Sequence, residues 1–254
     1  MKKVGVLYIC TGEYWKFWRD FYTSSEQYFL NDAEVHYYIF TDNAHLLDIV
    51  NSRIHPIYLK AMEWPFSTLK RFEFFHLNRG LFISTEYLFF CNANLLFLKN
   101  IFLDQLFVKN TLLAVKHPGF ENSKPGCFTD EKNVNSLAFI KRNKNSKYVC
   151  GGFNGGQTID FLRMSEYLMN NINLDLEKDI VAIWHDESHL NNYVERNREL
   201  FLVKSSDFCK PEEYKNKDTF VTVRNKSHLI SLKHKGLSYL IRGFFIKIYK
   251  KFKI

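Results

Sequence analysis

An alternation of apolar runs and helical patterns over the first hundred residues constrains the fold more than any other feature. Residues Val4–Cys10 form a continuous apolar run that ends at Thr11-Gly12, as in a parallel strand buried on both faces. Aromatic residues then recur at helical spacing over residues 13–30, and Val35–Phe40 predicts a second strand. This alternation predicts an open α/β sheet, which binds ligands beyond the carboxyl ends of its strands.

Later segments continue this pattern. The further predicted elements are a helix over residues 68–80, strands at Tyr87–Cys91 and Leu112–Val115, and a helix over residues 158–171. The glycine-rich run Gly151–Gly156 marks a place where the backbone must approach a neighbour closely. Since no repeat or low-complexity linker divides the chain, we expect one compact domain over residues 1–232.

The net charge of +8 is concentrated near the C-terminus. Nine Lys and Arg lie in residues 219–254, where no Asp or Glu occurs, so subtracting them from 35 leaves 26 basic against 27 acidic residues. Nucleic-acid binding by this near-neutral body is not expected. Residues 233–254 form a basic amphipathic tail, for which we favour peripheral attachment to an anionic membrane over packing of a terminal helix on the core.

Cysteine usage and the N-terminus both indicate a cytoplasmic protein. The five cysteines are odd in number, widely spaced and without a C-x-x-C pair, which predicts reduced thiols and not a disulfide framework or a zinc site. The chain runs from a short basic start directly into a strand, without the apolar region of a signal peptide. We therefore expect a cytoplasmic location, peripheral to the inner membrane through the tail.

The run Trp184–Tyr193 carries two carboxylates, two imidazoles and an indole. Adjacent carboxylates occur where a site stabilises positive charge or supplies a nucleophile. A structural alternative is a helix start, with Asp186 as the cap and Glu187 near the positive end of the helix dipole. A zinc site through His185 and His189 is disfavoured, because Glu187 stands about 100° from the position that the zinc-protease motif requires.

Several segments together resemble family 6 glycosyltransferases, which include the blood-group A and B transferases, the α1,3-galactosyltransferase and bacterial relatives. The matching segments are Gly12-Glu13-Tyr14, Phe21-Tyr22-Thr23-Ser24, Trp64 with Thr68-Leu69-Lys70-Arg71, Leu113–Phe120, Cys150–Gly156 and Trp184–Tyr193. The resemblance implies a GT-A fold, with a Rossmann-like mixed sheet flanked by helices. It also implies transfer of galactose or N-acetylgalactosamine (GalNAc) from a UDP-sugar to the 3-hydroxyl of an acceptor galactose, with the α configuration retained.

The resemblance assigns donor-side roles by position. The backbone of Ile9, Cys10 and Thr11 should contact the nucleotide, and Tyr14 should stack on uracil. Arg71 should contact the donor sugar or its phosphates, and Asp186 should bond the sugar hydroxyls. The remaining expected donor-site positions are Asn92, Asn94, Gly151, Gly152 and Lys226.

The resemblance also assigns the acceptor and catalytic positions. The expected acceptor-binding residues are His117, Thr129, Trp184 and His185. Glu187 should sit beneath the anomeric carbon of the donor, where it acts as a nucleophile or stabilises an oxocarbenium-like transition state. The residues leave these two mechanisms open.

A departure from the mammalian pattern concerns the metal. Mammalian members carry Asp-x-Asp, which binds Mn²⁺ on the diphosphate, whereas this chain has Asn92-Ala93-Asn94, as in the bacterial branch. Two neutral amides lack the charge that holds a hard divalent cation on a diphosphate, so we expect no metal or other cofactor. Lys226 is the first candidate to offset the charge of the leaving diphosphate and Arg71 the second. The alternative for Lys226 is a solvated surface lysine.

Donor and acceptor preference rest on fewer residues. The position of Gly152 is Gly in blood-group enzymes that use GalNAc and Ala in those that use galactose, so UDP-GalNAc is favoured over UDP-galactose. Cys150 matches neither enzyme, and residues 141–147 are basic where the family is Gly/Glu-rich, which leaves the acceptor and its need for fucose open. A catalytically degenerate sugar-binding protein is the non-enzyme alternative, and the intact Asp186-Glu187 pair argues against it.

Overall fold

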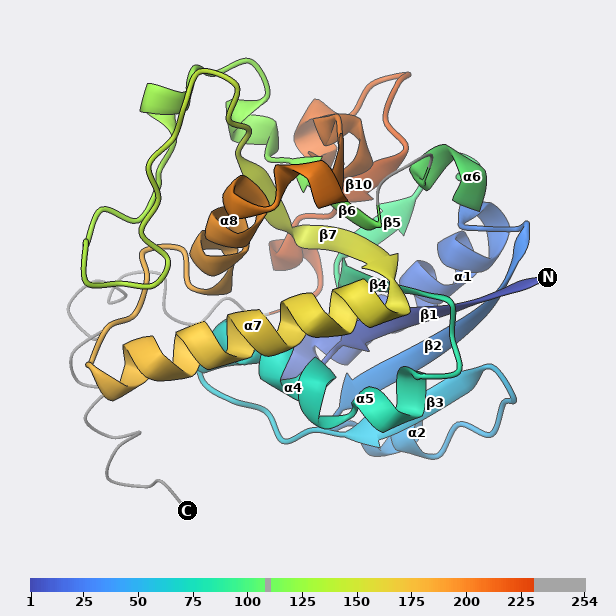
Figure 1. The fold of residues 1–254 in the computed structure, drawn as a ribbon. Helices are drawn as coiled ribbons and strands as arrows, with labels where there is room; N and C mark the ends of the chain where they lie inside the picture. The colour runs from blue at the N-terminus through green and yellow to red at the C-terminus, as the bar shows by residue number, and fades with distance from the viewer. Residues whose placement is uncertain (108–110, 231–254) are drawn as a thin grey trace.

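The computed structural model describes residues 1–107 and 111–230 (Figure 1). The expected amphipathic tail, residues 233–254, lies outside the described residues. Within these ranges, no helix is both long enough and apolar enough to cross a membrane. All five cysteines are free thiols, as expected, and only Cys127 among them is exposed.

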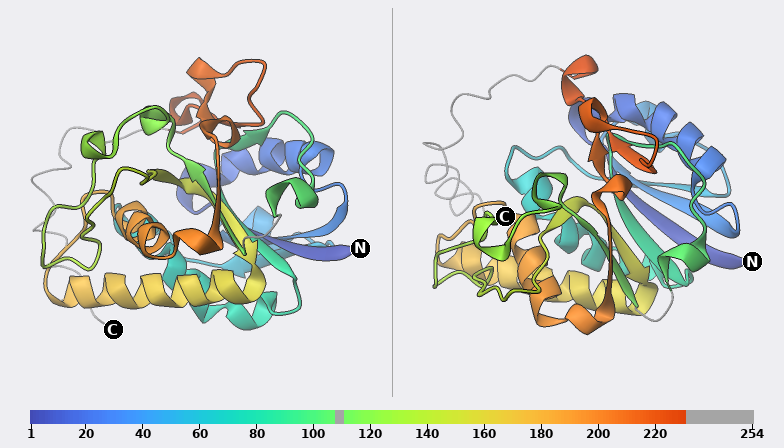
Figure 2. Two further views of the ribbon diagram at one scale, coloured as in Figure 1. Left: turned by 45° about the horizontal axis from the view of Figure 1, so that its top comes forward. Right: turned by 90° about the horizontal axis from the view of Figure 1, so that it is seen from above.

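A seven-stranded mixed sheet forms the centre of the fold (Figures 1 and 2). In their order across the sheet, its strands are β3 (Ile54–Tyr58), β2 (Ala33–Thr41), β1 (Lys2–Ile9), β4 (Tyr87–Asn92), β7 (Val149–Gln157), β6 (Leu112–Lys116) and β8 (Phe201–Lys204). Strands β1 to β4 are parallel, whereas β7 runs antiparallel to both of its neighbours. The predicted strands are confirmed, and the sheet is of the mixed, GT-A-like kind.

Helices cover both faces of this sheet. The α-helices are α1 (Trp18–Tyr28), α2 (Ala44–Leu47), α3 (Phe66–Leu69), α4 (Arg71–Leu77), α5 (Arg79–Phe82), α6 (Leu103–Leu106), α7 (Thr158–Glu177) and α8 (Asp186–Arg196). Helix α1 lies on one face, and α4, α5 and α7 lie on the other (Figures 1 and 2). This arrangement makes a three-layer α/β/α domain.

The alternation of side chains along β1 explains why two separate cores form. Val4, Val6 and Tyr8 enter the core under α1, which also contains Phe21. Leu7 points to the opposite face and joins the core under α4 and α7. Since successive strand residues face opposite sides, a strand that is apolar throughout requires helices on both sides.

The glycine-rich segment lies within β7 and contacts both neighbouring strands closely. A Cβ atom on Gly155 would lie 2.5 Å from Cδ1 of Phe89 in β4, and one on Gly156 would lie 2.5 Å from Cδ2 of Leu112 in β6. No side chain fits at such distances, so the predicted close approach of backbone is confirmed.

The predicted helix over residues 68–80 is wrong in its continuity. The chain forms α3, α4 and α5 in succession, with a break at Lys70, whose backbone has φ −90° and ψ 4°. The buried Lys70 ammonium donates to Glu73 at 2.6 Å and to Asn173 of α7 at 2.8 Å. This long-range contact with α7 has no signal in local periodicity, so the pattern of residues 68–80 by itself predicts one continuous helix.

A small three-stranded sheet closes the carboxyl ends of β1 and β4. Its strands, in order, are β5 (Leu95–Phe97), β10 (Val221–Val223) and β9 (Lys210–Pro211). Strand β10 pairs with β5 directly after the turn that follows β4. Residues 209–226 are thereby brought beside Asn92, far from them in the sequence.

Candidate active site

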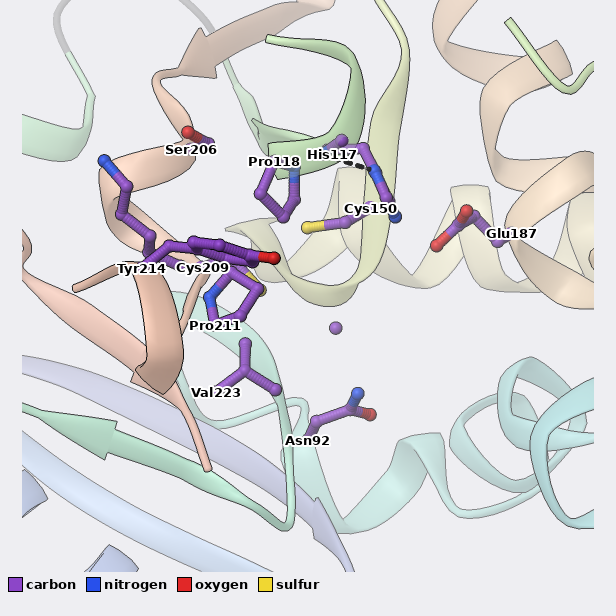
Figure 3. Close-up of a pocket in the computed structure, with 13 residues that line it drawn as sticks. Asn92, His117, Pro118, Cys150, Glu187, Ser206, Cys209, Pro211, Tyr214 and Val223 are labelled. Carbon is purple, nitrogen blue, oxygen red and sulfur yellow. Dashed lines mark hydrogen bonds between the residues drawn. The ribbon is translucent and has the colours of Figure 1, made fainter. Parts of the chain in front are cut away.

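Two cavities adjoin at Asn92, the last residue of β4. The first, of about 500 Å³, is lined by Glu187, His117, Cys150, Gly152 and Asn92 among others, and we call it the Glu187 cavity (Figure 3). The second, of about 380 Å³, is lined by Tyr14 and Arg71 and also includes Asn92, and we call it the Tyr14 cavity. Both lie where ligands are expected, at the carboxyl ends of parallel strands.

The Tyr14 cavity brings together most of the expected donor-side residues. It is lined by Ile9, Thr11, Tyr14, Arg71, Asn92, Asn94 and Lys226. Nζ of Lys226 lies 5.1 Å from the centre of the Tyr14 ring, so an aromatic face and a cation stand side by side. The ring can stack on a planar base, and the ammonium can pair with an anionic group next to that base.

Cys10 does not line this cavity, although it lies between two residues that do. Its thiol is buried in the core, its N–H donates to the Phe40 carbonyl at 2.9 Å, and its own carbonyl accepts from Thr41 Oγ1 at 3.1 Å. The backbone polar groups of Cys10 are therefore used within the protein. Its expected contact with the nucleotide stays a prediction.

Arg71, the first residue of α4, lines the Tyr14 cavity and contacts two residues that adjoin the lining of the Glu187 cavity in the chain. Its Nε lies 2.9 Å from Oδ2 of Asp186, and a terminal nitrogen donates to the Gly151 carbonyl at 2.8 Å. The guanidinium also stacks over the Phe90 ring, 4.4 Å from its centre. A buried arginine held in this way presents a fixed positive charge to the Tyr14 cavity.

Asp186 and Glu187 open α8, but they face different partners. Burial raises the pKa of Asp186 to about 6, an effect that Arg71 opposes and the negative charge of Glu187 reinforces. Burial also raises the pKa of Glu187, against the hydrogen bonds from Gly151 and Tyr148. Asp186 thus pairs with the arginine, whereas Glu187 lines the cavity that bears its name.

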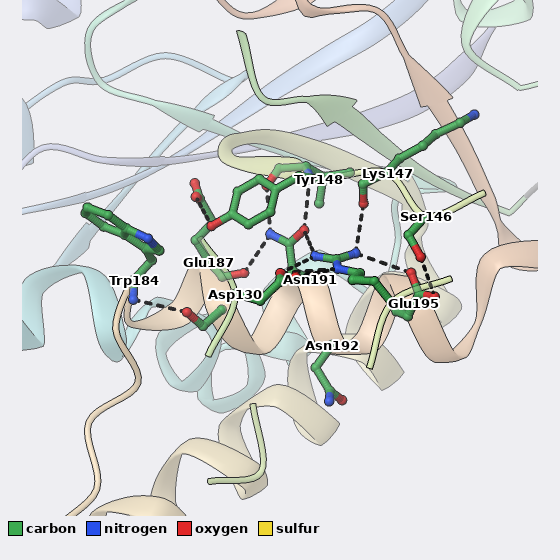
Figure 4. A network of polar contacts seen from close by, with 12 residues as sticks. Asp130, Ser146, Lys147, Tyr148, Trp184, Glu187, Asn191, Asn192 and Glu195 are labelled. Atoms are coloured by element: carbon green, nitrogen blue, oxygen red, sulfur yellow. Dashed lines mark hydrogen bonds and ion pairs between the residues drawn. The ribbon is translucent and has the colours of Figure 1, made fainter. Parts of the chain in front are cut away.

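Two hydrogen bonds orient the Glu187 carboxylate, and Figure 4 shows the one from Tyr148. Oε2 accepts from the Gly151 N–H at 2.8 Å, and Oε1 accepts from the Tyr148 hydroxyl at 3.1 Å. Burial raises the pKa of Tyr148, so the phenol remains a proton donor. A carboxylate fixed by two donors at a cavity wall can stabilise a developing positive charge or attack an electrophilic carbon.

His117 supplies a polar group on another wall of the Glu187 cavity (Figure 3). Its Nδ1 accepts a hydrogen bond from the Gly119 N–H at 3.1 Å, and burial lowers the pKa of the ring. In the neutral ring, the proton therefore resides on Nε2. That atom is available to donate to a hydroxyl of a bound ligand.

Three expected acceptor-side residues lie outside the Glu187 cavity. Trp184 is 42% exposed, and its backbone N–H donates to Ser188 Oγ at 3.0 Å. The His185 ring packs edge-on against Trp64, with ring centres 4.8 Å apart, and Thr129 does not line the cavity. The assignment of these residues to an acceptor stays a prediction.

The helix-start and zinc interpretations can also be compared with the structure. Helix α8 does begin at Asp186, but His185 occupies the N-cap position, with φ 55° and no capping hydrogen bond from its side chain. The buried His189 lies 3.6 Å from Asp175, away from the contact that His185 makes with Trp64. The two imidazoles therefore do not converge.

The pair Asn92 and Asn94 does not fit a hard divalent cation. Asn94 is buried, and its Nδ2 donates to the Arg224 carbonyl at 2.7 Å, which holds the two segments together. Neither residue offers a carboxylate, the ligand by which proteins usually hold Mn²⁺ or Mg²⁺ beside a diphosphate. Over residues 1–107 and 111–230, no three His, Cys, Asp or Glu side chains are grouped so that they could hold a metal.

Tyr148 and Asn191 also belong to this site, although they were not among the residues predicted for it. Asn191 Nδ2 donates to the carbonyls of Val149 and Glu187 at 2.8 and 3.0 Å, and its Oδ1 accepts from the Val149 N–H at 3.0 Å (Figure 4). It thereby joins α8 to β7 and fixes the position of Glu187. The only signal in the sequence was its place within the polar run Trp184–Tyr193.

Comparisons with known proteins agree with this geometry. Residues 2–228 match the model of the family described as Glycosyltransferase family 6. The chain is 34% identical over 224 residues to the O-antigen biosynthesis glycosyltransferase WbnI of Escherichia coli, covering 88% of this chain and 94% of that protein.

Vertebrate relatives match a smaller share of their own length. Identity is 27% over 198 residues with the Histo-blood group ABO system transferase 1 of Rattus norvegicus, covering 75% of this chain. It is 27% over 202 residues with the Globoside alpha-1,3-N-acetylgalactosaminyltransferase 1 of Homo sapiens, covering 77% of this chain. The chain spans 56% and 57% of these two proteins, so it corresponds to about half of each.

Proposed function

The chain belongs to glycosyltransferase family 6, and from this premise we propose that it transfers GalNAc, or galactose, from the UDP-sugar to the 3-hydroxyl of an acceptor galactose. The product is an α1,3 linkage, with the configuration of the donor retained. Membership of this family makes the protein a hexosyltransferase with a nucleotide-sugar donor and a glycan acceptor.

The observation that carries the proposal is the position of Glu187. Its carboxylate lines one cavity, and the cavity next to it, joined at Asn92, contains an aromatic face and two cations. The uracil and diphosphate of a donor fit the Tyr14 cavity, with Tyr14 under the base and Arg71 and Lys226 near the phosphates. The sugar then extends past Asn92 toward Glu187.

The chemistry required of the protein follows from that placement. The bond between the anomeric carbon and the diphosphate oxygen breaks, a bond to the acceptor oxygen forms, and the hydroxyl proton of the acceptor passes to the departing diphosphate. Positive charge develops at the anomeric carbon, where Glu187 stabilises it or attacks it. Asp186, fixed by Arg71, hydrogen-bonds hydroxyls of the donor sugar.

We also propose that transfer needs no metal ion. The support is the chemistry of the donor set, because the side chains of Asn92 and Asn94 are neutral amides that bring no negative charge to a divalent cation. Lys226 then offsets the charge of the departing diphosphate, with Arg71 as the second cation. Adding EDTA or Mn²⁺ to a transferase assay tests this, and strong dependence on the metal would contradict it.

UDP-GalNAc is the proposed preferred donor. Gly152 lines the Glu187 cavity without a side chain, and a Cβ atom there would crowd Asn92, whose Nδ2 would lie only 3.0 Å away. We propose that the donor uses the space that a methyl group at this position would take. The acetamido group of GalNAc can occupy that space. UDP-galactose is the alternative donor, used by an otherwise identical mechanism.

The acceptor that we propose is a galactose-terminated glycan or glycolipid at the bacterial surface, with or without a 2-linked fucose. The support is the relative from Escherichia coli, whose name assigns it to O-antigen biosynthesis. A product of this kind would mimic host blood-group antigens.

Attachment of the tail to the inner membrane would bring a cytoplasmic enzyme to a lipid-linked acceptor. Deleting residues 235–254 should then release the protein from membranes.

A direct assay tests the main proposal. The purified protein is incubated with UDP-GalNAc or UDP-galactose and a β-galactoside, with and without 2-linked fucose, and both UDP release and the glycan product are measured. We expect transfer with UDP-GalNAc as the better donor. Sugar binding without transfer or UDP release would instead favour the catalytically degenerate sugar-binding protein.

A further inference from the structure

A third cavity, of about 320 Å³, lies beside the Glu187 cavity and has no role in the function proposed above. We call it the lysine cavity because Lys116, Lys124, Lys144 and Lys147 all line it. Two of these lysines belong to the segment 141–147 that departs from the family pattern. Four ammonium groups around one cavity of this size create a site for negative charge.

The positive charge of this cavity is only partly neutralised. Glu121 is the one carboxylate among its lining residues, and it pairs with Lys116 at 2.7 Å. Burial alone would raise the pKa of Glu121. The Lys116 ammonium and the Ser206 N–H outweigh this effect and lower the pKa, so Glu121 stays ionised. In the described part of the chain, Lys124, Lys144 and Lys147 make no ion pair, and all three are exposed. An incoming anion meets three uncompensated cations.

The loop that carries two of these lysines is held firmly in place. The buried Arg142 side chain binds Asp130 at 2.7 Å and Glu195 at 3.2 Å, and it donates to the Lys147 carbonyl at 2.9 Å. Ser146 Oγ donates to Glu195 at 2.9 Å. Figure 4 shows the Lys147 side chain directed away from this network. The lysines are therefore presented by a preorganised loop, which lowers the entropy lost on binding.

The lysine cavity is separated from Glu187 by a thin wall. Tyr148 lines the lysine cavity, and its hydroxyl donates to Glu187 at 3.1 Å. His117 lines the Glu187 cavity, and its ring packs against Phe120, which lines the lysine cavity, with centres 5.2 Å apart. Phe128 adds a further aromatic surface. A glycan whose end reaches Glu187 can continue over these rings to the lysines.

We infer that the lysine cavity binds an anionic group of the acceptor, a carboxylate or a phosphate, located a short distance from the galactose that receives the transferred sugar. This inference rests on the proposed function, because it takes the acceptor to occupy the Glu187 cavity. The geometry selects acidic acceptors through binding, so its effect falls on KM more than on kcat.

Three acceptors of equal length test the inference: lactose, lactose 1-phosphate and a disaccharide of β-galactose 4-linked to glucuronic acid. The wild-type protein should show a kcat/KM about threefold to thirtyfold higher with an acidic acceptor than with lactose, as two or three exposed charge contacts allow. Comparison of the phosphate with the carboxylate identifies which anion fits. Added salt should reduce the preference.

Two variants complete the test. The double variant Lys144→Gln/Lys147→Gln should lose the preference for acidic acceptors and keep its kcat/KM for lactose. The variant Lys141→Gln is the matched control, because Lys141 is exposed on the same loop but does not line the cavity. Equal kcat/KM for all three acceptors in the wild type, or an unchanged preference in the double variant, overturns the inference.

Transfer to lactose measures the proposed function separately. If no acceptor is glycosylated, the proposed function fails, and binding of lactose 1-phosphate and lactose measured by NMR titration then tests the cavity by itself. Tighter binding of the phosphate by the wild type than by the double variant supports the inference. Equal binding by the two proteins contradicts it.

Discussion

Replacement of Gly152 by alanine gives the sharpest test of how the Glu187 cavity selects its donor. The new Cβ would lie 3.0 Å from Asn92 Nδ2 and 3.5 Å from Cys209 Sγ, and both side chains line the cavity. The backbone at Gly152 is not left-handed, since Gly12 is the glycine with positive φ. The methyl group therefore causes no backbone strain and displaces only one amide by a few tenths of an ångström.

The expected magnitudes separate an effect on folding from an effect on the donor. Stability should fall by about 1 kcal/mol or less, a loss of about 4 °C or less in Tm, because Asn92 faces an open cavity and can move. A methyl group in space meant for the acetamido group should cost about 1–3 kcal/mol, or about 5- to 150-fold in kcat/KM for UDP-GalNAc. Activity with UDP-galactose should change by about threefold or less, because that sugar leaves the space empty.

The assay measures kcat/KM for both donors with one acceptor, in the wild type and in two variants. Gly151→Ala is the matched control, because its Cβ would point to the other side of the strand, 3.5 Å from Glu187 Cβ and 3.6 Å from Asp186 Oδ2. These are ordinary van der Waals distances, so Gly151→Ala should leave the ratio of the two donors unchanged. An unchanged ratio of the two donors in Gly152→Ala, or an equal shift in both variants, would refute the steric argument.

The remaining predictions concern charges at the site. Glu187→Gln should lower kcat by at least about 10²-fold while UDP affinity, measured by calorimetry, stays the same, and weakened UDP binding would contradict the assigned position of Glu187. Burial raises the pKa of Asp186 to about 6. Protonation of Asp186 should therefore lower kcat/KM about tenfold for each pH unit below about pH 6. A flat profile of kcat/KM down to about pH 4.5 would count against this role of Asp186. Lys226→Gln should lower kcat about tenfold, whereas the exposed Lys215→Gln should have no effect, and equal activities would leave Lys226 as a solvated lysine.

Local pattern was sufficient to predict the sheet and the chemical character of the site. The apolar runs at Val4–Cys10 and Tyr87–Cys91 have the length and composition of strands buried on both faces, so they required helices on both sides of a sheet. The run Trp184–Tyr193 contains two consecutive carboxylates, which indicated a site that stabilises positive charge. These features are encoded within a few neighbouring residues, where periodicity is set by strand and helix geometry.

The division of labour between the two carboxylates was decided by tertiary structure. Asp186 and Glu187 are adjacent in the chain, yet one pairs with Arg71 and the other is held by Gly151 and Tyr148. The hydrogen bond from Arg71 to Gly151 joins residues 80 positions apart, and that from Tyr148 to Glu187 joins residues 39 apart. No local pattern specifies such pairs, because they depend on how β7, α4 and α8 pack.

The sequence alone determined a two-sided α/β sheet, a carboxylate pair at its functional end and a segment, 92–94, without metal-binding charge. It also showed that residues 141–147 are basic, but it gave no reason for that charge. Only the fold placed Lys144 and Lys147 around a cavity next to Tyr148, because Arg142 anchors their loop to Asp130 and Glu195. Composition fixes how much charge a segment carries, whereas long-range packing decides which surface that charge faces.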